Sequence, residues 1–279
     1  MPSSRTLCRL AALGAAVLFS TGGAAIKATT LTSWQVASFR SGIAALAVLA
    51  LAPAARRDWS WRAWLAGAAY AATLITFVLA NKLTTSANAV FLQSTGPLYL
   101  LALSPLLLKE RVRAREVAVM ALMALGMALV LFSGQRHLAT APDPARGNML
   151  GAASGLTWAF TLVSLRWLSG SAMTMVVAGN VVACLAALPQ ALPLLSSTAT
   201  DWLVLGYLGI VQVGLAYWLM SYAVKQLPAL EVSLLVLAEP ALNPVWTVIL
   251  HGERPAPWAI LGGALILAAT LANLFRRAV

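Results

Sequence analysis

Ten long apolar stretches constrain this chain more than any other feature. Each is bounded by charges, prolines or Ser/Thr clusters, and together they cover residues 7–27, 34–52, 63–82, 86–108, 116–133, 148–166, 172–194, 202–224, 229–250 and 257–275. A helix needs about 20 apolar residues to cross a bilayer. The strands of a membrane barrel are shorter and alternate polar with apolar residues. The sequence therefore predicts an all-α integral membrane protein with ten transmembrane helices.

The composition excludes a large soluble domain. Apolar residues make up 61% of the 279 residues and charged residues only 10%, against about 45–50% and about 25% in soluble domains. Ten spans leave roughly 80 residues for all loops. The net charge of +11 would favour nucleic acid in a soluble chain, but here the basic residues lie at the ends of the apolar stretches. We therefore expect the protein to associate with the lipid bilayer and not with nucleic acid.

The chain offers no pattern for a cofactor, metal or nucleotide. Cys8 and Cys184 lie near or inside apolar stretches and have neither disulfide nor metal-ligand spacing. A phosphate-binding Gly-rich loop with Lys and Ser/Thr does not occur, and the histidines, His137 and His251, lie in or near loops. We expect a protein that is not an enzyme.

The first apolar stretch has two interpretations. Behind Arg5 and Arg9, it could be the core of a cleaved signal peptide, because small residues follow at 22–25. The motif Leu-Gly-Ala-Ala at 13–16 favours a retained helix, since it recurs at 150–153 at the start of the sixth stretch.

The distribution of basic residues predicts the orientation. With the N-terminus inside, loops on that face contain thirteen Lys and Arg, whereas the opposite face contains five, and Arg40 lies within the second stretch. Positive charge concentrates on the cytoplasmic side of membrane proteins. We expect a multi-pass protein of the inner (plasma) membrane with both termini in the cytoplasm.

An internal repeat organises the chain. Ala80 to Pro97 spans 18 residues, as does the similar segment from Ala223 to Pro240, and a Glu-Arg pair begins 13 residues after each proline. Five is an odd number of helices, so the second copy enters the membrane with the opposite polarity. The result is an inverted repeat, the architecture associated with alternating access around a site near the membrane midplane. We expect a first five-helix repeat over 1–133, a linker over 134–147 and a second, inverted repeat over 148–279.

These features resemble a known family. In each copy a Pro-containing fourth helix precedes a Glu-Arg loop (Glu110-Arg111 and Glu253-Arg254) and a fifth helix rich in small residues. This pattern is similar to EamA-type members of the drug/metabolite transporter (DMT) superfamily, and it covers nearly the whole chain. Residues 92–99 (Leu-Gln-Ser-Thr-Gly-Pro-Leu-Tyr) and 157–160 (Thr-Trp-Ala-Phe) further resemble the YddG-type amino-acid exporters.

The resemblance implies that helices one, three, four, six, eight and nine line a substrate cavity. Polar and aromatic residues form helical stripes on the third, fourth, sixth and ninth stretches. Aromatic rings offer apolar area and faces for cations or other rings, and amides can bind an ammonium or a carboxylate. The candidate substrate-binding residues are Phe77, Asn81, Gln93, Tyr99, Trp158, Glu239 and Asn243. The same residue types are typical of helix interfaces, so packing is the alternative for each.

Two charges lie within the predicted spans. Glu239 is near the middle of the ninth, where an ionisable residue is a functional candidate. Arg40 lies one to two turns from the outer end of the second, so we expect its side chain to extend to the membrane surface or to line an outer cavity. The stripes contain no pair of basic residues of the kind that would bind a phosphorylated sugar.

Pro97 and Pro240 occupy equivalent places in the two copies. Each removes a backbone hydrogen bond and favours a kink, which could serve as a hinge or simply shape the packing. Small multidrug-resistance pumps, which are distant relatives, use a Glu on the first helix for proton exchange. The matching positions here are Ser20 and Thr157, so coupling through Glu239 and facilitated export both remain open.

The sequence therefore predicts an exporter of amino acids, including aromatic or other neutral ones, and of similar small metabolites. An exporter of cationic or aromatic drugs is the alternative, and a lipid scramblase or membrane-embedded enzyme is a remote one. With ten helices, a single chain could enclose its own pathway as a monomer.

Overall fold

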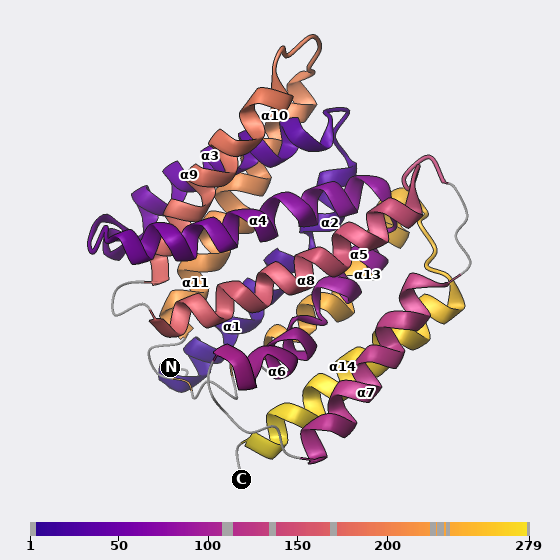
Figure 1. Ribbon diagram of the computed structural model, residues 1–279. Helices are drawn as coiled ribbons and strands as arrows, with labels where there is room; N and C mark the ends of the chain where they lie inside the picture. The colour runs from indigo at the N-terminus through magenta and orange to yellow at the C-terminus, as the bar shows by residue number, and fades with distance from the viewer. Residues whose placement is uncertain are drawn as a thin grey trace.

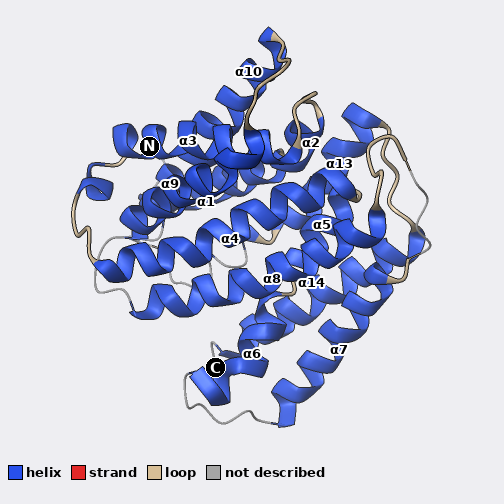
Figure 2. Ribbon diagram, turned by 45° about the horizontal axis from the view of Figure 1, so that its top comes forward, coloured by secondary structure: helices blue, strands red, loops and turns tan. Residues whose placement is uncertain are grey.

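A computed structural model covers the chain and describes residues 4–107, 114–133, 138–167, 172–223, 227, 232 and 235–277. Within these residues the regular structure is helical, apart from one isolated bridge between Leu138 and Ala141 (Figure 2). The first half contains α1 (Ser4–Ser20), α2 (Gly22–Lys27), α3 (Ser33–Leu51), the short 3-10 helix η1 (Pro53–Arg56), α4 (Trp61–Leu83), α5 (Ser86–Gln93), α6 (Gly96–Leu107) and α7 (Ala114–Leu131). The second half contains α8 (Pro144–Trp167), α9 (Ala172–Ala191), α10 (Ala199–Gly206), the π-helix η2 (Tyr207–Leu215), α11 (Ala216–Ala223), α13 (Ala238–His251) and α14 (Pro257–Arg277).

These helices account for the ten predicted spans. Five continuous stretches are long and apolar enough to cross a membrane: Arg5–Lys27, Ser33–Leu51, Trp61–Leu83, Ala172–Ala191 and Ala199–Ala223. Shorter apolar helices lie within α7 and α14. The 24-residue α8, the pair α5 and α6, and α13 occupy the remaining predicted spans. The expectation of ten transmembrane helices in two inverted repeats is confirmed.

The contacts between helices repeat across the two halves. Helix α4 packs along α8 as α11 packs along α1, and α5 packs on α8 as α13 packs on α1. Two further pairs join equivalent helices of the two halves, α3 with α9 and α7 with α14. The start of α1 and the end of α14 lie at the same end of the bundle, at the lower left of Figure 1. We call this the terminal end and the opposite one the far end.

Glycines allow the closest approaches between the halves. A Cβ on Gly67 of α4 would lie 2.8 Å from the backbone nitrogen of Gly179 in α9. A Cβ on Gly126 of α7 would lie 2.7 Å from the carbonyl oxygen of Gly262 in α14. Such backbone contact is typical of membrane helices, where small residues let helices pack closely. The α7 and α14 pair stands at one edge of the bundle (Figures 1 and 2).

Helices that begin at the far end have side-chain caps. Thr32 and Gln35 form a reciprocal capping box at α3, Thr85 caps α5, and Thr198 with Asp201 caps α10. Each cap satisfies backbone N–H groups that a helix start leaves unpaired. These caps fix where α3, α5 and α10 begin.

Four of the predicted spans are not uniform α-helices, and the ninth has a turn at Leu237 before α13. The first is interrupted at Thr21, and the fourth at Ser94 and Thr95, between α5 and α6. The eighth contains the nine-residue π-helix η2 between two α-helical parts. Hydropathy alone predicted these spans as continuous helices, because an interruption in the backbone leaves the apolar character of the side chains unchanged.

Candidate functional site

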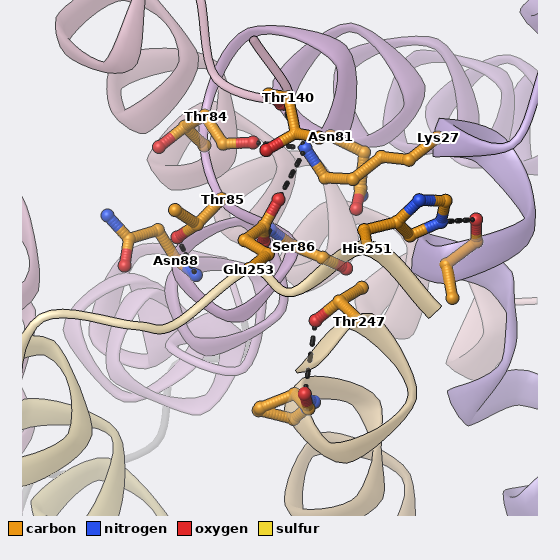
Figure 3. Close-up of polar contacts among 12 residues, drawn as sticks. Lys27, Asn81, Thr84, Thr85, Ser86, Asn88, Thr140, Thr247, His251 and Glu253 are labelled. Atoms are coloured by element: carbon orange, nitrogen blue, oxygen red, sulfur yellow. Dashed lines mark hydrogen bonds and ion pairs between the residues drawn. The ribbon is translucent and has the colours of Figure 1, made fainter. Parts of the chain in front are cut away.

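A buried ion pair closes the far end. Lys27 Nζ lies 3.1 Å from Glu253 Oε2, and the two side chains are 2% and 0% exposed. Lys27 also donates to the carbonyl oxygens of Thr84, at 2.9 Å, and of Thr140. Glu253 Oε1 accepts from the backbone N–H of Ser86 at 2.6 Å. We call these five residues the latch (Figure 3).

The latch places each charge at a favourable helix end. Lys27 is in the last turn of α2, where the helix dipole favours a cation. Glu253 accepts a hydrogen bond from the first residue of α5, where the dipole favours an anion. Lys27 belongs to the first repeat and Glu253 to the second, so the pair holds the two repeats together.

A layer of hydrogen bonds lies beside the latch. The Ser86 hydroxyl donates to Asn243 Oδ1 at 2.7 Å, and Asn243 Nδ2 donates to the Ser20 carbonyl at 3.0 Å. Trp246 Nε1 donates to the Ser20 hydroxyl at 2.9 Å. A Cβ on Gly23 would lie 1.8 Å from the Ser86 hydroxyl oxygen, so only glycine fits there. The layer fixes α13 to the first span and to α5.

Other loops at the far end are bound in the same way. Lys82 donates to the Thr29 carbonyl at 2.7 Å and to its hydroxyl at 3.0 Å. Asp201 accepts from the backbone and hydroxyl of Thr30 at 2.7 and 2.8 Å. Two of the five basic residues that the sequence assigns to this face, Lys27 and Lys82, thus hold loops together.

Two of the predicted site residues belong to this end. Asn243 is 1% exposed, and both polar atoms of its amide are engaged by Ser20 and Ser86. Asn81 is fully buried and donates to the Phe77 carbonyl at 3.0 Å, while its Oδ1 has no hydrogen-bond partner. Ser20, which replaces the Glu of the small multidrug-resistance pumps, lies in the same layer.

The other predicted site residues are spread through the bundle. Gln93, at the end of α5, donates to the Ser154 hydroxyl at 2.9 Å. Phe77 and Trp158 are partly buried against apolar clusters. The Tyr99 hydroxyl is directed toward α7, 3.5 Å from the sulfur of Met127, which separates it from the others.

The placement of the Arg40 side chain differs from the prediction. The side chain does not extend to the membrane surface, because Arg40 is 2% exposed and lies near the middle of the 19-residue helix α3. Helix α3 packs against α4, α9, η2 and α11, which enclose this face. Its Nε and Nη2 atoms have no hydrogen-bond partner. The expectation that Arg40 snorkels to the interface is wrong.

Two tyrosines interact with both Arg40 and Glu239. The guanidinium interacts electrostatically with Tyr70 of α4 and Tyr217 of α11, and both tyrosines interact with Glu239, in the first turn of α13. The two tyrosine rings are 6.0 Å apart at 77°, and Phe19 packs edge-on to Tyr217 at 5.1 Å. We call Arg40, Tyr70, Tyr217 and Glu239 the central cluster. Two of its members come from each repeat.

The central cluster contains both enclosed and accessible groups. Arg40 and Tyr70 are buried, whereas Tyr217 and Glu239 keep part of their surface accessible. The cluster contains one basic and one acidic side chain, each of which interacts with the same two tyrosines. Sequence analysis identified Glu239 but not Tyr217, because Tyr217 lies on the eighth stretch, where no stripe of polar residues was recognised.

The two prolines lie at the start of new helices. Pro97 is the second residue of α6, after the break at Ser94 and Thr95, and Pro240 is the third residue of α13, after a turn at Leu237. Proline is tolerated in a first helical turn because the N–H that it lacks would be unpaired there. Discontinuous helices of this kind are typical of secondary transporters. The Glu110-Arg111 pair lies outside the described residues.

The π-helix η2 brings Gln212 to the interruption in the first span. Gln212 Nε2 donates to the Phe19 carbonyl at 3.4 Å, and its Oε1 has no hydrogen-bond partner. π-helices are rare and frequent at functional sites. Nearby, a cavity of about 530 Å³ lies between the first span, α10, η2 and α13, with Tyr207, Trp246 and His251 in its wall. Among the described residues, no group of three or more His, Cys, Asp or Glu could hold a metal ion.

Comparison with known proteins agrees with this architecture. The model of the EamA-like transporter family matches the chain twice, at residues 6–132 and 145–275. The chain belongs to the EamA-like transporter family. One solved crystal structure of a protein is similar with a TM-score of 0.65 and 23% identity, over 98% of this chain and 99% of that one, which shows a common fold. No curated protein sequence matches the chain.

Membership gives this EamA-like protein its general activity. It is a multi-pass membrane transporter of the DMT type. The two matches of the family model cover the two halves that the internal repeat predicts. The latch and the central cluster each contain residues from both halves, so both features depend on how the repeats meet.

Proposed function

We propose that this EamA-like transporter exports amino acids and similar small metabolites across the inner membrane by alternating access. Both termini and the terminal end face the cytoplasm, as the distribution of basic residues favours. The far end then faces outward. Inverted repeats support such a cycle, because the two halves can exchange conformations and open the same site to each side in turn.

The observation that carries this proposal is the closure of the far end by contacts between the repeats. The Lys27–Glu253 pair and the bonds from Asn243 to Ser20 and Ser86 all join one repeat to the other. Opening the far end requires these bonds to break together. In this proposal, the closed far end is the outward side of the transporter in its inward-facing state.

The candidate substrate residues act in two groups in this proposal. Phe77, Gln93, Trp158 and Glu239 keep accessible surface and would contact the substrate directly. Asn81 and Asn243 form the outer boundary of the site and would be released when the far end opens. Tyr99 would act from the side of α7, and Pro97 and Pro240 would serve as hinges at the two helix starts.

A counterflow assay in proteoliposomes tests the substrate. Proteoliposomes that contain the purified protein are loaded with unlabelled amino acid. Entry of labelled Met, Thr or Phe into the vesicles is then followed with all twenty amino acids as competitors. Competition by neutral amino acids supports the proposal. Absence of flux for every amino acid would contradict it.

Export of cationic or aromatic drugs is the second candidate. It is favoured by Glu239, a partly exposed residue that interacts with Tyr70 and Tyr217, since a carboxylate and aromatic faces both attract cations. Competition by quaternary ammonium compounds without competition by amino acids would favour this candidate.

A further inference from the structure

Arg40 is a buried cation without a counter-ion. Within the part of the chain that the structure describes, it forms no ion pair, and two of its guanidinium nitrogens lack a hydrogen-bond acceptor. Arginine remains charged in proteins. Burying a charge with unpaired N–H groups is strongly unfavourable, so the position needs a compensating partner.

The neighbours of Arg40 favour an anionic partner. Tyr70 and Tyr217 both interact with the guanidinium, and their hydroxyls are hydrogen-bonded to each other, which leaves one O–H of the pair to donate to an anion. The planar guanidinium itself can donate two parallel hydrogen bonds to a carboxylate. Arg40 of α3 and the tyrosine pair from α4 and α11 thus offer donors to the same group.

Glu239 adds a charge of the opposite sign. It interacts with the same two tyrosines and keeps accessible surface. One arginine and one carboxylate together match a molecule that carries one negative and one positive group. A phosphorylated sugar would need a second cation, and the buried Lys27 is already bound to Glu253 at the far end.

We propose that Arg40 is the residue that binds the carboxylate of the transported substrate, with the hydroxyl pair of Tyr70 and Tyr217 supplying one further donor. Glu239 receives the ammonium group of the same molecule. This inference rests on the proposed function and narrows the substrate class to α-amino acids and related small zwitterions.

The test compares an amino acid with its carboxamide. Exchange of phenylalanine and of phenylalaninamide is measured in proteoliposomes with the wild type, Arg40→Lys and Arg40→Gln. The amide has the same ring and ammonium but no carboxylate. We expect the wild type to prefer the acid, and Arg40→Gln to lose about tenfold or more in acid exchange, since charge-assisted hydrogen bonds are worth that much. Amide exchange should change little, and Arg40→Lys should retain part of the preference.

Arg56→Gln is the matched control. Arg56 is exposed, lies beyond the end of α3 and donates to the Leu49 carbonyl, so its loss should leave the ratio of acid to amide unchanged. Size-exclusion chromatography and thermal unfolding check that each variant is folded. Stabilisation of the detergent-solubilised wild type by phenylalanine, absent in Arg40→Gln, gives a binding measurement independent of transport.

The outcomes separate the two proposals. If the wild type exchanges amino acids and folded Arg40→Gln keeps the same preference for acid over amide, Arg40 does not bind the carboxylate and the proposed function stands. An equal loss of acid and amide exchange would assign Arg40 a structural role. If the wild type exchanges no compound with a carboxylate, both proposals fail.

Discussion

Among the residues that the structure describes, Lys27 and Arg40 have buried cationic side chains with contrasting surroundings. Lys27 at the far end has a carboxylate and two carbonyl oxygens as partners. Arg40 at the centre has two guanidinium nitrogens with none. Removing one partner of a buried ion pair is strongly destabilising, whereas a buried guanidinium with unpaired N–H groups is suited to a ligand. The comparison assigns the two cations different roles: Lys27 joins the repeats, and Arg40 is the candidate for ligand binding.

The strongest test of the latch is to lock it. A disulfide between Ser86→Cys and Asn243→Cys, in a background without Cys8 and Cys184, should abolish exchange, because the far end could not open. A reductant should restore flux, which is measured as counterflow before and after reduction.

A cysteine pair within one repeat provides the control for that experiment. Thr32→Cys with Gln35→Cys also lies at the far end, at the N-cap and third residue of α3, and both positions belong to the first repeat. Its disulfide should leave exchange largely intact. Equal inhibition by both disulfides would contradict a latch that acts between the repeats.

Removing Lys27 should lower the free energy of unfolding far more than removing Arg40. Lys27→Met leaves Glu253 buried and unpaired and should lower the free energy of unfolding by about 3–5 kcal/mol. Arg40→Gln removes a charge that lacks partners and should cost little or nothing. Thermal unfolding in detergent measures both. The double variant Lys27→Met with Glu253→Gln should recover part of the loss, and a larger cost for Arg40→Gln than for Lys27→Met would reverse the comparison.

Glu239→Gln should weaken recognition of the ammonium group. We expect about a tenfold rise in KM for phenylalanine exchange, because a charge-assisted hydrogen bond becomes a neutral one. N-acetylphenylalanine, which has no ammonium, should be affected less. The same KM change for both compounds would exclude Glu239 from ammonium binding.

The double substitution Pro97→Ala with Pro240→Ala should have the smallest effect. Both prolines lie in first helical turns, where alanine is compatible with folding. Exchange should slow by a few-fold while the unfolding temperature changes little. Unchanged flux in reconstituted vesicles would reject a hinge at these positions.

The sequence predicted the helices and their inversion because both depend on composition and repetition. Hydropathy identified each span, and the matching segments ending at Pro97 and Pro240 identified the two halves. The sequence could not predict that Lys27 pairs with Glu253, since their pairing depends on how two distant loops approach each other. The Glu-Arg motif marked Glu253 as notable but gave no partner.

The position of Arg40 was mispredicted for a related reason. Distance from a helix end is readable in sequence, but the direction of the side chain depends on which face the neighbouring helices cover. The interruption at Ser94 and the π-helix around Gln212 also leave hydropathy unchanged. By contrast, Glu239 could be identified because an acid in an apolar span is rare whatever surrounds it.

Thr140 gives the latch a connection beyond the helices. It belongs to the segment that joins the two halves, and its carbonyl accepts from Lys27. Release of the latch therefore frees a point on that connecting segment. A fluorophore attached at the neighbouring, exposed residue Ala139 would accordingly report the release of the latch from the aqueous surface. No label inside the membrane would be needed.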